Sequence, residues 1–76
     1  MRQAISDDEL FATLKAMCEC SNHLIVAKQE DFSTSNYEAL AEKMADVKFW
    51  LDKIADQIGY TEDVEWWLSR KMNRHE

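Results

Sequence analysis

The sequence predicts an all-α protein: an antiparallel helical hairpin plus a short third helix, with two copies pairing into a homodimeric helical bundle. The 76 residues include no proline and one glycine, Gly59, whereas turn-rich β architectures need more of both. Apolar residues also recur at three- and four-residue steps, the period of an amphipathic helix. We expect a single helical domain over 1–76, with helices at about 6–29, 34–58 and 61–74.

The first helix has a marked beginning. Ser6 and Glu9 stand at the spacing of a capping box, and Ile5 and Leu10 flank them as a hydrophobic staple would. A broad apolar stripe follows, which comprises Leu10, Phe11, Leu14, Met17, Cys18, Ser21, Leu24 and Ile25.

Residues 30–34 are expected to form a short connection, and short connections join antiparallel helices. Two residues compete as the cap of the second helix. Ser33 would place a hydrophobic staple around the helix start, whereas Ser35 would bring Glu38 into a capping box.

The second helix carries the most regular pattern in the chain. Seven residues alternate steps of three and four, as in knobs-into-holes packing, and form a seam predicted to face the first helix: Tyr37, Leu40, Met44, Val47, Leu51, Ile54 and Ile58. Gly59 follows at the position of a left-handed C-cap.

A shorter third helix is predicted from Thr61, which would serve as its cap. Acidic residues open it and basic residues close it, an order that complements the helix dipole. The acids are Glu62, Asp63 and Glu65, and the bases are Arg70, Lys71 and Arg74. Its apolar face consists of Val64, Trp67, Leu68 and Met72.

Large aromatic residues remain outside these faces. If the seam faces the first helix, Phe49 lies on the opposite side of the second helix, Trp50 lies on a flank, and Trp66 points away from the apolar face of the third helix. Three interpretations stay open: the third helix folds over Trp50, the rings form a homodimer interface, or they bind a different protein. The predicted protein-interaction residues are Phe49, Trp50, Trp66, Glu42 and Asp46.

The net charge is −6, with 15 acidic and nine basic residues, which argues against nonspecific binding to nucleic-acid phosphates. Five acids are expected along the outer face of the second helix around Phe49: Glu38, Glu42, Asp46, Asp52 and Asp56. This row fits a solvated face, a surface that docks onto a basic protein partner, or DNA mimicry, which Phe49 would interrupt. The basic end of the third helix leaves a small nucleic-acid-associated regulator as an alternative.

Cys18, Cys20 and His23 form a Cys-x-Cys-x-x-His cluster on the first helix, and His75 is the only other histidine. The two cysteines point to different sides of a helix, and the fourth ligand of a structural zinc site would be missing unless His75 supplied it. We therefore expect no metal, cofactor or catalytic site, with Cys18 in the core, Cys20 flanking it and His23 exposed near Glu19. A Cys/His metal-binding protein or a thiol-dependent activity is the remaining alternative.

These features together predict a non-enzymatic protein–protein interaction module, a homodimer that acts as an inhibitor or adaptor. Small acidic helical proteins of this composition are common among phage and mobile-element products that bind a host protein. The residues before the first helix do not resemble a signal peptide, and we expect no membrane span because no apolar run is long enough to cross a bilayer. Free thiols fit a reducing compartment, so we expect a cytoplasmic protein without a membrane partner.

Overall fold

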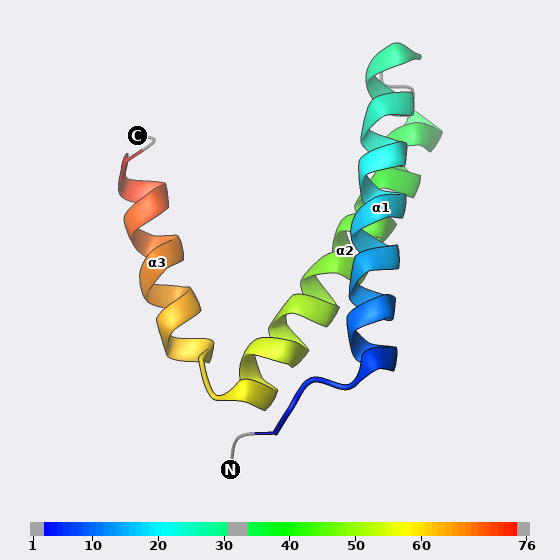
Figure 1. The fold of residues 1–76 in the computed structure, drawn as a ribbon. Helices are drawn as coiled ribbons and strands as arrows, with labels where there is room; N and C mark the ends of the chain where they lie inside the picture. Colours follow the sequence, from blue (N-terminus) through cyan, green and yellow to red (C-terminus); the bar gives the residue numbers. More distant parts are fainter. Residues whose placement is uncertain (1–2, 31–33, 75–76) are drawn as a thin grey trace.

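The computed structural model describes residues 3–30 and 34–74, and all of the regular structure in those two ranges is helical. The helices are α1 (Asp7–Gln29), α2 (Thr34–Ile58) and α3 (Thr61–Arg74). α1 and α2 lie side by side as an antiparallel hairpin, and α3 leaves the end of α2 as the second arm of a V (Figure 1). The predicted all-α hairpin with a short third helix is confirmed.

The capping box at the start of α1 is present. The Ser6 Oγ accepts a hydrogen bond from the Glu9 N–H at 3.1 Å, and the Glu9 carboxylate accepts one from the Ser6 N–H, also at 3.1 Å. α2 begins at Thr34, so Ser35 lies inside the helix and is not its cap. The competing cap, Ser33, lies outside the described residues.

The turn between α2 and α3 is a Schellman motif. Gly59 has a φ of 80°, which costs little for a residue without a Cβ atom. The Gly59 N–H donates to the Asp56 carbonyl at 3.2 Å, and the Tyr60 N–H donates to the Ala55 carbonyl at 2.8 Å. Thr61 is already the first residue of α3 rather than its predicted cap, because the Tyr60 carbonyl accepts the Val64 N–H at 3.0 Å.

The buried core of the described chain is small. It consists of Thr13, Ala16, Ala27, Leu40 and Ala55, of which Leu40 is the one large apolar side chain. Ala16 and Ala27 carry only a methyl group, so the backbones of α1 and α2 can approach closely there. A core of this size buries little apolar surface, and the hairpin gains correspondingly little free energy from it.

α2 is rotated about its axis relative to the predicted seam. Leu40 is buried and Val47, Ile54 and Ile58 are partly buried, but Tyr37, Met44 and Leu51 are about half exposed. Lys43 and Trp50 are instead partly buried beside α1. Two features of α1 favour this rotation: Glu19 accepts a hydrogen bond from Lys43 Nζ at 3.1 Å, and Ala12 and Ala16 leave space beside the Trp50 ring.

The segment before α1 is held against the end of α2 through Gln57. The Gln57 carbonyl accepts the Gln3 N–H at 2.9 Å, and Gln57 Nε2 donates to the Ala4 carbonyl at 2.9 Å and to Glu9 Oε1 at 3.0 Å. The bond from Gln57 is the main reason that the pKa of Glu9 lies below its ordinary value; the bonds from Ser6 lower it further. This tie closes the open end of the hairpin and was not predicted.

The molecule is extended and thin. Its principal extents are 45 × 35 × 14 Å, and its radius of gyration is 14.8 Å, whereas a compact domain of 76 residues has one of about 11 Å. The smallest extent, 14 Å, is about what a single packed pair of helices occupies. α3 therefore does not lie over the hairpin.

Candidate protein-interaction surfaces

The chain exposes far more surface than a compact monomer of its size. Its solvent-accessible area is 6378 Å², whereas a compact monomer of 8.9 kDa exposes about 4,800 Å². The excess, about 1,600 Å², includes many apolar side chains that are two-fifths or more exposed. Clusters of exposed apolar side chains usually mark binding surfaces.

One such surface surrounds the aromatic pair on α2. Phe49 is 59% exposed, and its ring meets the Trp50 ring edge to face at a centroid distance of 5.4 Å. Lys53 Nζ lies 4.9 Å from the centre of the Trp50 ring, a cation–π contact. Trp50 is partly buried and borders a hollow whose α1 wall includes Ala12 and Ala16. Trp50 thus lies beside α1, whereas α3 does not lie over the hairpin. The interpretation in which α3 folds over Trp50 is therefore wrong.

Glu42 and Asp46, the two acids of the predicted site, are both exposed. Asp46 borders the same hollow of about 430 Å³ as Trp50, together with the Lys43–Glu19 pair. The hydrogen bond and charge of Lys43 lower the pKa of Glu19, and Glu19 in turn raises the pKa of Lys43, helped by Asp46 and Glu42. We call this side of the hairpin, which carries the Lys43–Glu19 ion pair, the polar face.

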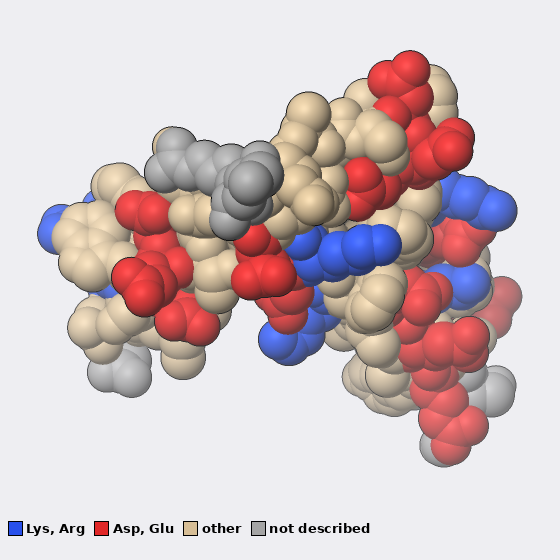
Figure 2. All heavy atoms as spheres, turned by 90° about the horizontal axis from the view of Figure 1, so that it is seen from below, with Lys and Arg blue, Asp and Glu red and all other residues tan. Residues whose placement is uncertain are grey.

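The predicted row of acids on α2 is not one continuous stripe. Asp52 accepts a hydrogen bond from Lys48 at 3.2 Å, and Asp52 and Asp56 line a groove shared with α3, whereas Asp46 borders the hollow beside α1. Viewed from below, acidic side chains are spread over both arms of the V and are interleaved with basic ones on the hairpin (Figure 2). The surface is therefore mixed in charge.

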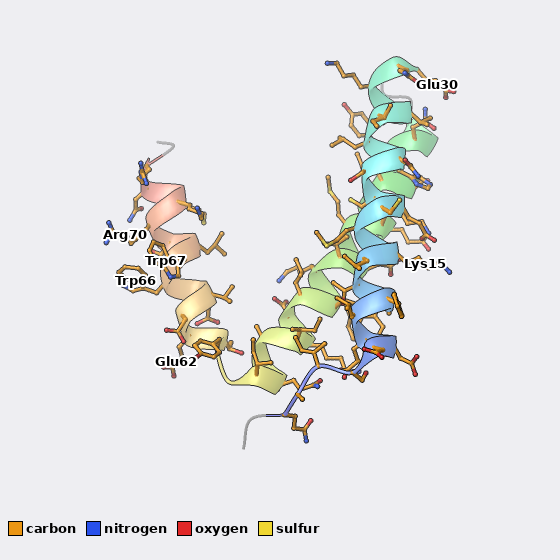
Figure 3. All side chains as sticks on the ribbon, in the orientation of Figure 1. Lys15, Glu30, Glu62, Trp66, Trp67 and Arg70 are labelled. Carbon is orange, nitrogen blue, oxygen red and sulfur yellow. The ribbon has the colours of Figure 1, made fainter. Side chains whose placement is uncertain are left out.

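A second aromatic surface lies on α3. Trp66 and Trp67 are 52% and 56% exposed, and their rings meet edge to face at 4.7 Å. The Arg70 guanidinium carbon lies 4.8 Å from the centre of the Trp66 ring. Trp66 and Arg70 project from the side of α3 that is remote from the hairpin (Figure 3). The predicted site residue Trp66 thus lies on a different arm of the V from Phe49 and Trp50.

A third surface is apolar, and the sequence pattern predicted that it would be used for packing within the chain. Met17, Cys20, Ser21, Leu24 and Val47 line a shallow groove of about 200 Å³ between α1 and α2. Helical spacing extends this surface along both helices. We define the hairpin apolar face as Leu10, Leu14, Met17 and Leu24 of α1 with Tyr37, Met44, Val47 and Leu51 of α2.

The apolar face of α3 is equally uncovered. Val64, Trp67, Leu68 and Met72 are each about half exposed. Val64 and Leu68 border a groove of about 380 Å³ whose other wall is formed by α2 near its C-terminal end. α3 thus contacts α2 only near the Gly59 turn, and the arms diverge beyond it (Figure 1).

The cysteines and His23 differ from expectation. Cys18 is exposed and Cys20 is partly buried, the reverse of the predicted arrangement. His23 is partly buried rather than exposed, and its Nδ1 donates to the Glu19 carbonyl at 2.9 Å. Within residues 3–30 and 34–74, no three His, Cys, Asp or Glu side chains gather as metal ligands would, and His75 lies outside those ranges.

Two further findings concern membrane-spanning helices and similarity to known proteins. None of the helices in the described part of the chain is long and apolar enough to cross a membrane. Comparisons with protein-family models, with curated proteins and with solved structures gave no match.

Proposed function

We propose that this protein is a non-enzymatic protein-interaction module that works as an inhibitor or adaptor by occupying the surface of another protein. The observation that carries the proposal is the presence of two exposed aromatic clusters, in which Phe49 of α2 is 59% exposed and Trp66 of α3 is 52% exposed. Because exposed apolar area costs free energy in water, a chain that exposes so much of it gains stability by binding.

Two surfaces fit a protein partner. On the outer side of α2, Phe49 stands near Glu42 and Asp46, a combination suited to an apolar pocket rimmed by Lys and Arg side chains. On α3, Trp66 contacts Arg70. Tryptophan, arginine and tyrosine are the residue types most enriched among binding hot spots. Each aromatic is already held by a neighbouring ring or cation, so less conformational entropy is lost on binding.

A non-enzymatic role is supported by how the nucleophile and base candidates lie. Cys18 is exposed on α1, and its Sγ lies 4.0 Å from Asn22 Nδ2. His23, the base within reach of Cys20 along the helix, donates its Nδ1 proton to the backbone carbonyl of Glu19, one turn earlier on α1. This arrangement suits a structural histidine.

The test compares Phe49→Ala and Trp66→Ala with wild type for capture of proteins from the native host, followed by calorimetry with the purified partner. We expect at least one variant to weaken the partner's dissociation constant by about tenfold or more, as hot-spot truncation does. Phe11→Ala is the matched control, because Phe11 is 65% exposed but lies on α1. Equal capture by wild type and both variants would refute the proposal.

A further inference from the structure

We infer that the hairpin apolar face is covered by α3 of a second copy of this chain, in a reciprocal two-fold dimer. Each V would close on the other, so that two equivalent contacts form, each between one subunit's α3 and its partner's hairpin. The inference goes beyond the proposed function, because it names the occupant of an apolar surface that lies apart from Phe49 and Trp66.

A subunit's own α3 is held away from that face. Only Gly59 and Tyr60 connect α2 to α3, and the two Schellman hydrogen bonds fix the direction in which α3 leaves. Val64 and Leu68 consequently border the opening of the V, where they are about half exposed. An α3 that cannot reach its own hairpin can reach that of a second copy.

The two surfaces match in length. The α1 part of the hairpin apolar face runs from Leu10 to Leu24, about 21 Å at 1.5 Å per residue. α3 has 14 residues and is therefore also about 21 Å long. Both surfaces are apolar, as the core of an interface must be.

The area also fits a stable dimer. Burial of the excess, about 1,600 Å² per subunit, corresponds to about 3,200 Å² in the pair. Obligate dimers bury roughly 2,000 to 5,000 Å², and weak crystal contacts mostly bury less than about 800 Å². A second copy would thus restore the exposed area per subunit to that of a compact protein.

Charge distinguishes this arrangement from a contact between two hairpins. α1 and α2 together carry nine acidic and five basic residues, a net charge of −4, so two hairpins packed face to face would repel each other. The C-terminal half of α3 carries Arg70, Lys71 and Arg74. With Glu62, Asp63 and Glu65 at its other end, α3 has no net charge, so it would meet an acidic hairpin with less repulsion than a second hairpin would.

The experiment uses the full chain and two charge variants, Leu68→Glu on α3 and Met17→Lys on the hairpin apolar face. Light scattering and sedimentation should give wild type about twice the 8.9 kDa subunit mass. Each variant damages both contacts, so its dimer dissociation constant should rise by roughly 100-fold or more. An equimolar mixture should recover dimers, because a heterodimer contains one wild-type contact and one contact with opposite charges.

Phe49→Lys is the matched control and should remain dimeric, because Phe49 lies outside both contacting surfaces. Helicity by circular dichroism shows that each variant is folded; if Met17→Lys is not, Leu14→Lys replaces it on the same face. A monomeric wild type at about 100 µM, a dimeric Leu68→Glu variant, or a mixture that stays monomeric overturns the inference. If wild type is monomeric while Phe49→Ala still weakens partner capture, the dimer is refuted and the proposed function stands.

Discussion

The clearest test of the fold is truncation of Leu40, the one large apolar side chain that is buried among the residues that the structure describes. Leu40 is 5% exposed, so Leu40→Ala removes three carbon atoms from an almost fully buried site. At about 0.8 kcal/mol per buried carbon, the transfer term is about 2.3 kcal/mol. The residual cavity should add little, because a molecule only 14 Å thick lets neighbours and water relax into it. We expect a loss of about 2.5 kcal/mol, a large part of the total stability.

The matched control is Leu24→Ala, the same chemical change at a site that is 48% exposed. In the Leu68→Glu background, where we expect monomers, it should cost about half as much, about 1.2 kcal/mol. In the wild-type background the cost should rise towards that of Leu40→Ala, because a second copy covers Leu24. Urea unfolding followed by circular dichroism measures all of these values. A Leu40→Ala cost below about 0.5 kcal/mol would show that α1 and α2 do not pack as described.

Three further predictions use other parts of the hairpin. Ala27 is fully buried, so Ala27→Leu should force the helices apart and lower the free energy of unfolding by about 1–3 kcal/mol in urea; a neutral effect would contradict the close approach. Because the pKa of Glu9 is lowered in the folded chain, ionised Glu9 stabilises the fold at pH values above its ordinary pKa of 4.5. This contribution is lost as the pH falls below that value. Gln57→Ala should therefore lose less stability than wild type in an acid titration of thermal unfolding, and an identical pH profile would argue against the hydrogen bond. Iodoacetamide should alkylate exposed Cys18 roughly fivefold faster than Cys20, as measured by peptide mass spectrometry. The ratio of the two rates should rise with protein concentration, because the inferred dimer covers the groove that Cys20 lines. Equal rates would contradict the burial of Cys20.

Features with local signals in the sequence could be predicted from it. The capping box needs only Ser6 and Glu9 at a fixed spacing, and the C-cap needs only a residue that accepts a positive φ, which Gly59 is. The hairpin follows from the short connection between two periodic segments. Each of these depends on a few neighbouring residues, so no knowledge of the packed structure was required.

The rotation of α2 could not be predicted, because its apolar residues span a wider arc than one neighbouring helix can cover. Which part of that arc faces α1 depends on α1 itself: Glu19 attracts Lys43, and Ala12 leaves room for Trp50. The same limit applies to the direction of α3, which the hydrogen bonds of the Gly59 turn determine. Periodicity identifies apolar residues but not which neighbour covers them.

The polar face and the hairpin apolar face are suited to different contacts. On the polar face Lys43 is paired with Glu19 within one chain, so these two charges would lose hydration without gaining partners if another subunit covered them. The opposite apolar face gains free energy when covered, so assembly should use that face. Phe49 and Glu42 lie on neither contact surface of the inferred dimer and would stay accessible after it forms. A partner bound through Phe49 should then leave the dimer intact, whereas a partner that bound the hairpin apolar face would compete with assembly and release monomers.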